Sequence, residues 1–395
     1  MTLPVLYATP QLCYNPIIEH TVSLPGFPPN ILAQFPVFSF GQQETVFAAA
    51  FEILQQAIAQ HAFPGSSVAV TSQGKLVALK AFGRFTYEPD SPEVTPASIF
   101  DLASLTKVVS TTTMAMILYE RGQLDLDMPV VSLVPEFRSE DSRRSEVTVR
   151  QLLSHSSGLP AYEKLFLKTR TRGDLVDAAC SASLTSDPGT KTEYSDIGFI
   201  ILGLALERLA EDSLDHFCQH EVFGPLGMMH TAFRPPATWQ PIIPPTADDQ
   251  SFRHRIIQGE VQDENASVMG GVAAHAGLFA DAKDIAIFAH ALLQGGRPIL
   301  RPETVSLFTR RETSPPGTSC ALGWDTPSQP SQSGKHFSAT SFGHLGYTGT
   351  SLWIDPQRQL SVTLLTNRTW PDCKNEAIKQ ARPAFHDAVV EALEE

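Results

Sequence analysis

Ser104-Leu105-Thr106-Lys107 begins the stretch around which the fold is organised. The run that follows, 108–118, holds only apolar and hydroxyl-bearing side chains, and no charge appears before Glu120. A helix of this composition is expected inside a domain. Because positions i and i+3 share a helical face, we expect the Lys107 ammonium beside the Ser104 hydroxyl. The stretch therefore predicts a buried helix that fixes a serine and a lysine side by side.

A second Ser-x-x-Lys pair, Ser72-Gln73-Gly74-Lys75, separates two strand-like runs, 67–70 and 76–79. Its glycine favours a hairpin turn, so this pair has no helix to fix its geometry. Upstream, apolar residues recur at helical spacing over 44–61, which predicts a helix. Because such pairs arise by chance in a chain of this length, other residues must decide whether Ser104 is catalytic.

The composition is that of a globular protein with one or two domains: 395 residues, of which 42% are hydrophobic. The formal net charge of −13 disfavours nucleic acid and anionic membranes as partners, because both favour a basic surface. The stretch from Met1 to Pro10 lacks the pattern of a signal peptide, and no run approaches the ~18 apolar residues of a membrane span. We therefore expect a cytoplasmic protein, whose oligomeric state the sequence does not indicate.

The five cysteines are scattered and odd in number, which favours reduced thiols over a disulfide framework. One helical segment contains residue types that bind zinc, namely His216, Cys218, His220 and Glu221. The two histidines stand at i and i+4, as on a metal-binding helix, but no second cluster accompanies them. Ordinary helix positions explain these residues better, so we expect no metal and no cofactor.

Helix and strand signals occur in blocks along the chain. The middle is predicted to contain an exposed charged loop over 138–146 and helices over 148–155, 197–209 and 214–223. Towards the C-terminus the sequence predicts a helix over 282–293, strands over 351–354 and 360–365, and a final helix over 375–393.

These blocks predict an α/β fold in which an antiparallel sheet flanked by helices is built from both chain ends. Residues 1–43 are rich in proline and lack periodicity, so we expect an N-terminal extension there. The α/β domain is predicted over 44–103 and 271–395, and a mostly helical inserted domain over 104–270.

A second candidate motif is Tyr194-Ser195-Asp196, which follows a turn and precedes a helix. A tyrosine at such a junction can project its phenol into a cleft. The unperturbed phenol pKa of about 10 is high for a base, but a neighbouring ammonium lowers it, and Lys107 is a candidate for that neighbour. The alternative is a tyrosine whose ring packs and whose hydroxyl caps a backbone group.

A third motif, His344-Leu345-Gly346-Tyr347-Thr348-Gly349-Thr350, lies directly before a predicted strand. Its glycines permit close approach of a substrate, and a strand edge can offer an N–H group to a developing oxyanion. A glycine-rich turn that enters a hairpin is the alternative.

The three motifs in this order resemble those of the serine β-lactamase and penicillin-binding protein superfamily, which has Ser-x-x-Lys, then Tyr-x-Asn or Ser-x-Asn, then Lys-Thr-Gly or a variant. Further similar stretches are Leu152 to Pro160, Pro225-Leu226-Gly227-Met228 and Gly270 to Phe279. The resemblance runs from about Glu44 to the C-terminus. It is closest to the class C β-lactamase-like family VIII carboxylesterases.

The resemblance implies a role for each matching residue. Ser104 would be the acylated nucleophile, Lys107 its electrostatic partner and Tyr194 the general base. The backbone N–H groups of Ser104 and Tyr347 would form the oxyanion hole. Three more residues would contact the substrate: Asp196, His344 and Gly346.

Two positions depart from the family pattern. Asp196 stands where the family usually has asparagine, and its charge is expected to keep Lys107 protonated, which favours Tyr194 as the base. His344-Leu345 replaces Lys-Thr, the cation and hydroxyl that usually hold a β-lactam carboxylate. Recognition of penicillins is therefore less expected than recognition of other acyl compounds.

We therefore expect a serine hydrolase that forms an acyl-enzyme on Ser104 and acts on a small-molecule ester or amide, most plausibly on small carboxylic esters. One alternative is a β-lactamase or D-alanyl-D-alanine carboxypeptidase. Another is a non-catalytic module that keeps the fold as a ligand sensor. The active site is expected between the α/β and helical domains, where small-molecule sites are common.

Overall fold

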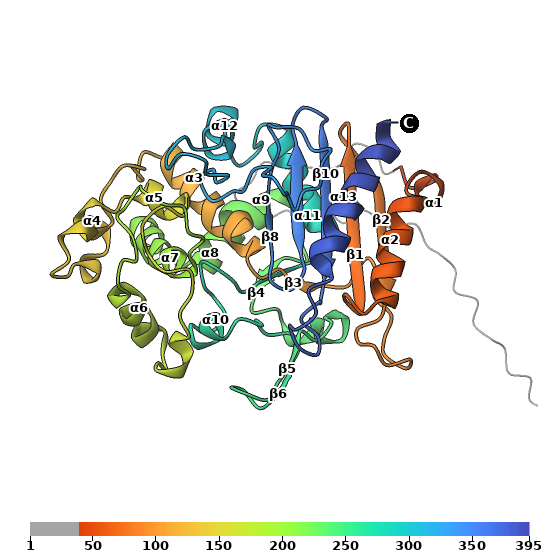
Figure 1. The fold of residues 1–395 in the computed structure, drawn as a ribbon, viewed down its shortest axis with the longest axis horizontal. Helices are drawn as coiled ribbons and strands as arrows, with labels where there is room; N and C mark the ends of the chain where they lie inside the picture. Colours follow the sequence, from red (N-terminus) through yellow and green to blue (C-terminus); the bar gives the residue numbers. More distant parts are fainter. Residues whose placement is uncertain (1–38, 395) are drawn as a thin grey trace, which may run out of the picture. The chain divides into compact units, whose positions relative to one another are not determined.

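The computed structural model describes residues 39–394. Its central sheet is antiparallel and has the strand order β2-β1-β10-β9-β8. These strands are β1 (Gly65–Ser72), β2 (Lys75–Gly83), β8 (Phe342–Leu345), β9 (Ser351–Asp355) and β10 (Leu360–Thr366). The N-terminal hairpin thus lies beside a C-terminal strand (Figure 1), which confirms the α/β fold built from both chain ends. The predicted turn at Gly74 joins β1 and β2.

Alternation along β1 explains how helices cover both faces of the sheet. Val68 and Val70 pack in one apolar cluster with residues of α2 (Ala48–Ala59) and α13 (Ile378–Glu394). Ala69, which points the other way, belongs to a second cluster with residues of α11 (Ala282–Leu293). Successive side chains of a strand point to opposite faces, so β1 contributes to both cores. The edge strand β8 lies on the side of the helical region (Figure 1).

The middle of the chain is mostly helical, as predicted. Its helical elements are η1 (Lys107–Thr112), α3 (Thr113–Glu120), α4 (Val130–Leu133), η2 (Pro135–Phe137), η3 (Ser142–Glu146), α5 (Val149–Leu153), η4 (Leu165–Leu167), α6 (Arg172–Ser181), α7 (Asp196–Ala210), α8 (Leu214–Cys218), η5 (Gln219–Phe223), α9 (Gly224–Leu226), η6 (Ala237–Ile242) and α10 (Glu264–Val268). The turn η1 is a π-helix, and all its residues are buried. The uncharged run after Lys107 therefore forms a buried helix, as its composition predicts.

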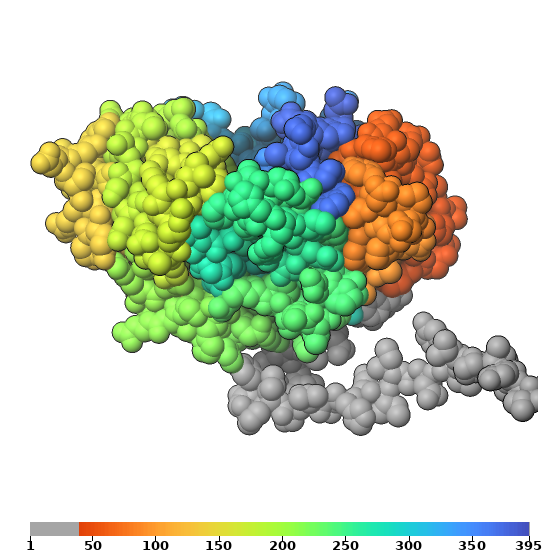
Figure 2. All heavy atoms as spheres, turned by 90° about the horizontal axis from the view of Figure 1, so that it is seen from below, coloured from red at the N-terminus to blue at the C-terminus, as the bar shows by residue number. Residues whose placement is uncertain are grey.

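Two small sheets were not predicted. One joins β3 (Phe100–Asp101), β7 (Leu278–Ala280) and β4 (Ala232–Phe233), and the other pairs β5 (Ala247–Asp249) with β6 (Arg255–Ile257). Figure 2 shows the green segment that contains β5 and β6 on the surface between yellow helical elements and orange residues near the N-terminal strands. Strands of two or three residues are too short for a periodic signal.

The prediction of an exposed loop over 138–146 is wrong at Arg144. Its side chain is buried and donates hydrogen bonds to the carbonyl oxygens of Phe137 and Ala182, at 3.0 and 2.6 Å. These bonds satisfy backbone acceptors that would otherwise be buried without partners. A charge in the sequence therefore does not by itself mark an exposed position.

The predicted domain bounds stay predictions. The helix α12 (Pro302–Thr309), in the second α/β segment, packs against α3 of the helical region. Most of the extension predicted over 1–43 lies outside the described residues; within it, Ser39 N–H donates to Leu76 O of β2, and α1 (Gln43–Val46) leads into α2. No helix in the described part of the chain is long and apolar enough to cross a bilayer.

Candidate active site

The backbone before Ser104 is held in an unusual conformation. Ala103 has a φ of 47°, in the left-handed region that a Cβ disfavours by roughly 1–2 kcal/mol. The buried Asp101 carboxylate accepts the Ala103 N–H at 2.8 Å, and Thr348 Oγ1 donates to Asp101 O at 2.7 Å. Side chains far apart in the sequence thus hold this turn, which places Ser104 at the head of the buried helix.

Lys107 lies behind Ser104 and is completely buried. Its ammonium donates to Ser104 Oγ at 3.0 Å, to Asp196 Oδ1 at 2.6 Å and to His275 O at 3.1 Å. An ammonium has three N–H donors, so all of them are used. Burial lowers the pKa of Lys107, but Asp196 and the Tyr194 hydroxyl raise it more, and the net pKa lies above the usual 10.5. Lys107 is therefore a fixed cation at neutral pH.

Tyr194 lies on the other side of this ammonium. The centroid of its ring is 4.7 Å from Lys107 Nζ, and 41% of the residue is exposed. That exposed surface faces the cavity, and the Lys107 charge and the neighbouring Ser104 hydroxyl favour the phenolate. Burial of the hydroxyl nevertheless raises the pKa of Tyr194 above 10. Lys107 lowers this pKa, as expected, but desolvation outweighs the ammonium, so the net shift is upward.

Two neutral histidines flank the Tyr194 ring. The His155 and His344 rings lie 4.6 and 5.8 Å from it, measured between centroids. Burial and the Lys107 charge lower the pKa of His155 well below 6.5 and that of His344 to about 3. His344 Nδ1–H donates to Leu345 O at 2.8 Å, which fixes its tautomer. His344 therefore lies where the motif predicts but supplies no positive charge at neutral pH.

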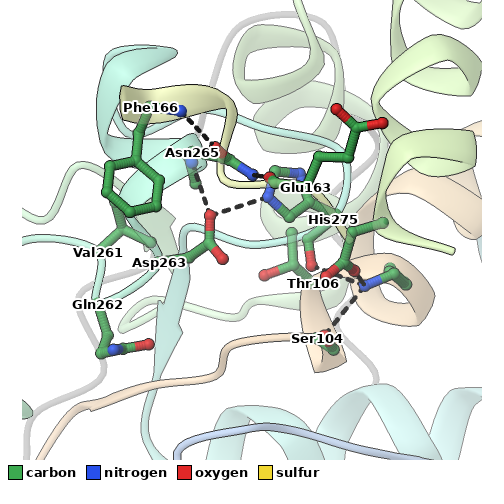
Figure 3. A network of polar contacts seen from close by, with 12 residues as sticks. Ser104, Thr106, Glu163, Phe166, Val261, Gln262, Asp263, Asn265 and His275 are labelled. Atoms are coloured by element: carbon green, nitrogen blue, oxygen red, sulfur yellow. Dashed lines mark hydrogen bonds and ion pairs between the residues drawn. The ribbon is translucent and has the colours of Figure 1, made fainter. Parts of the chain in front are cut away.

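A further set of contacts fixes His275, whose carbonyl accepts a hydrogen bond from Lys107. His275 accepts from Lys107 through its carbonyl, while its ring Nε2 lies 3.0 Å from Asp263 Oδ1. The same Asp263 oxygen accepts the Ala266 N–H at 2.7 Å and so caps α10. Figure 3 shows Asp263 between His275 and the start of α10, with Ser104 beyond His275. A carboxylate, and not a backbone group, therefore holds the Nε2 side of the His275 ring.

Burial raises the pKa of Asp263, but His275 lowers it more, so the carboxyl stays ionised. Asp263 both caps α10 and lines the cavity. The contact with His275 was missed because the two side chains stand apart in the sequence and share no recognisable spacing.

These residues surround one cavity of about 830 Å³. Ser104, Tyr194, Asp196, His344, Gly346 and Tyr347 line it, and Lys107 lies in its wall. A side chain at Gly346 would collide with Thr350 Oγ1, which explains the glycine. The structure thus brings every predicted site residue to one place, while their roles stay predictions. Tyr162, His155 and Arg382 also line the cavity and were given no role from the sequence.

The side chains that resemble zinc ligands have other partners. His216 Nδ1 lies 2.7 Å from Asp212, Glu221 forms an ion pair with Arg121 at 2.6 Å, and Cys218 is buried in the core. Within residues 39–394, no group of three or more histidine, cysteine, aspartate or glutamate side chains is placed to hold a metal ion.

Comparison with known proteins assigns the chain to a family. A curated relative, N-acetylmuramyl-L-alanine amidase of Bacillus subtilis (strain 168), is 31% identical over 345 residues, which cover 78% of this chain and 77% of the relative. A putative D-alanyl-D-alanine carboxypeptidase of Salmonella agona (strain SL483) is 29% identical over 348 residues, with 78% and 79% covered.

Solved structures share the fold at lower identity. EstCE1, a hydrolase with promiscuous acyltransferase activity, gives a TM-score of 0.73 at 22% identity and covers 88% of this chain and 99% of its own. A penicillin-binding protein homologue from Caulobacter crescentus gives 0.70 at 20% identity, with 88% and 98% covered. The family model described as beta-lactamase matches residues 50–383. The chain belongs to the beta-lactamase family, within the superfamily of serine hydrolases that also includes the penicillin-binding proteins.

Proposed function

We propose that the protein hydrolyses small acyl compounds, with carboxylic esters as the first candidates, through an acyl-enzyme on Ser104. The observation that carries the proposal is the contact of the Lys107 ammonium with both Ser104 Oγ and Asp196 in the wall of the cavity. A serine becomes a nucleophile when a neighbouring group accepts its proton and a fixed charge stabilises the products of that transfer.

Tyr194 is the group proposed to move the proton. Because its raised pKa keeps the phenol protonated at rest, the transfer takes the form of a relay. The phenol oxygen accepts the Ser104 proton while the phenol's own proton passes to the leaving group, so no free phenolate is required. The Lys107 ammonium stabilises the negative charge that gathers on the phenol oxygen during this exchange.

The oxyanion is proposed to bind to the backbone N–H groups of Ser104 and Tyr347. Within residues 39–394, neither N–H group donates a hydrogen bond to the protein, although both residues line the cavity. Two such donors stabilise the negative oxygen of the tetrahedral intermediate. Water then attacks the acyl-enzyme, with Tyr194 again moving the proton, and releases the acid and Ser104.

Amide hydrolysis is a second candidate, favoured by the names of the two curated relatives, an amidase and a putative carboxypeptidase. The raised pKa of Tyr194 also suits this reaction, because an amine leaving group must receive a proton as it departs. Penicillins are less favoured, since His344 is neutral and Leu345 has no hydroxyl.

The proposal is tested by labelling and turnover together. Intact mass spectrometry with a fluorophosphonate should show one adduct on the wild type and none on Ser104→Ala. Turnover of a para-nitrophenyl butyrate ester, an alanine para-nitroanilide and nitrocefin then separates an esterase, an amidase and a β-lactamase. Labelling that survives Ser104→Ala would overturn the assignment of the nucleophile. A stable adduct with each substrate, without turnover, would favour a ligand sensor.

A further inference from the structure

The cavity continues past the edge strand β8 to a basic end at the C-terminal helix. Leu345 and Ile378 line this part, and Arg368, Lys379 and Arg382 surround it. Lys379 is exposed and forms an ion pair with Glu376 at 2.7 Å, so its charge is balanced. Within residues 39–394, neither guanidinium group at this end forms an ion pair with a carboxylate.

Arg382 is buried: only 4% of its surface is exposed. Its guanidinium has five N–H donors, of which one terminal nitrogen donates to Gln332 Oε1 at 3.0 Å. Its Nε is buried and has no hydrogen-bond partner among residues 39–394. No carboxylate in the described part of the chain forms an ion pair with it. A buried, incompletely bonded cation therefore faces a cavity that also contains Ser104.

The carboxylate that lines this end of the cavity, Glu376, is paired with Lys379 and forms no ion pair with Arg382 within residues 39–394. Arg368 donates to Tyr347 O at 2.6 Å and to Cys373 O at 3.2 Å, and its guanidinium lies 4.4 Å from the centroid of the Tyr347 ring. His386, on the next turn of α13, is neutral because burial and Arg382 lower its pKa to about 3. Burial and Arg368 lower the pKa of Arg382 itself to about 9, so it still carries its charge at neutral pH.

A buried cation without an anion is costly, and a planar guanidinium matches a carboxylate with two parallel hydrogen bonds. The edge strand supplies no competing cation, because His344 is neutral. We propose that the protein prefers acyl substrates that carry a carboxylate, and that Arg382 binds this carboxylate at the basic end of the cavity. The proposal rests on the proposed function, since it names the substrate class of the same site.

Matched substrates test the preference. The first pair is para-nitrophenyl butyrate and the mono-para-nitrophenyl ester of glutaric acid, which places a carboxylate in the acyl group. The second pair is phenyl butyrate and meta-butyryloxybenzoate, which places it in the leaving group. The wild type should favour the charged member of at least one pair. Arg382→Met should lower kcat/KM for that member about tenfold or more, while kcat/KM for its neutral partner changes less than about twofold.

Lys379→Met is the matched control, because it removes a cation from the same end of the cavity and should keep the preference. Equal effects of Arg382→Met on both members of each pair, or no preference in the wild type, would overturn the proposal. If none of these esters is hydrolysed, the proposed esterase activity fails, and calorimetric titration with glutarate still tests the anion site by itself.

Should Arg382→Met fail to fold, the wild type alone decides. Glutarate should then bind more tightly than the uncharged glutaramide, and the difference should shrink as salt is added. Equal binding of the two compounds would contradict the proposal.

Discussion

Two buried cations lie along the same cavity, and their surroundings differ. Lys107 uses all three of its N–H donors, one of them on the Asp196 carboxylate. Arg382 binds one neutral amide, that of Gln332, and has no carboxylate partner within residues 39–394. Because an unpaired buried charge costs several kcal/mol, the protein itself balances Lys107, whereas a ligand is left to balance Arg382. This difference fits a role of Lys107 in the reaction and a role of Arg382 in binding a substrate carboxylate.

Lys107→Met should have the largest effect. It removes the ammonium that touches Ser104, so kcat/KM should fall about a thousandfold for neutral and charged esters alike. The variant also leaves Asp196 unpaired, but this side chain is partly exposed, so the free energy of unfolding should fall by only about 2 kcal/mol. Steady-state kinetics and urea unfolding measure the two effects.

Arg382→Met is the comparison, because it should leave kcat/KM for the neutral ester nearly unchanged. If Lys107→Met hydrolysed the neutral ester within about tenfold of the wild type, the two cations would not differ in the proposed way.

Tyr194→Phe comes next. Loss of the phenol hydroxyl removes the proton relay, so kcat should fall roughly a hundredfold to a thousandfold. The change removes a buried hydroxyl next to Lys107 and Ser104, so the free energy of unfolding should fall by about 1 kcal/mol. Kinetics with the neutral ester measure the effect.

The matched control is Tyr162→Phe, since Tyr162 lines the same cavity and is 40% exposed. It should keep near-normal kcat. Equal losses of kcat in the two variants would mean that either cavity-lining phenol affects turnover and that Tyr194 has no specific role in proton transfer.

The parts of this site that the sequence could predict are those that depend on short spacings or ordered motifs. Ser104 and Lys107 stand within one helical turn, so local geometry alone places them together. Tyr194 and His344 were found through the order of motifs. Arg382 gave no signal, because its role depends on contacts with a loop 50 residues away and on a cavity that the tertiary fold creates.

For the fold, too, the sequence could predict only the elements that give a long periodic signal. Long periodic runs such as α11 and β10 were predicted within one residue of their ends, while the short strands β3 to β7 were not. The direction of the Tyr194 pKa shift could not be predicted from the sequence either, since desolvation depends on how the folded molecule packs.

Asp196→Asn should have a smaller effect that depends on pH. Asparagine keeps an oxygen that accepts from Lys107 but removes the negative charge that raises its pKa. Burial would then lower the pKa of Lys107, so the ammonium would be lost at a lower pH than in the wild type. Activity should fall about tenfold at about pH 9 and less near pH 7. Identical pH profiles of kcat/KM would show that Asp196 does not maintain the charge.

His386→Gln should have the smallest effect on activity, and its effect is on stability at the Arg382 end. The folded pKa of about 3 lies below the unfolded value of 6.5, so between these limits the unfolded chain binds a proton that the folded chain does not. As pH falls through this window, the histidine should cost about 1.4 kcal/mol of unfolding free energy per pH unit. The variant should lose this slope, which urea unfolding at several pH values measures. Arg382→Met should narrow this pH window only in part, because burial is the larger cause of the lowered pKa and the Arg382 charge the smaller one.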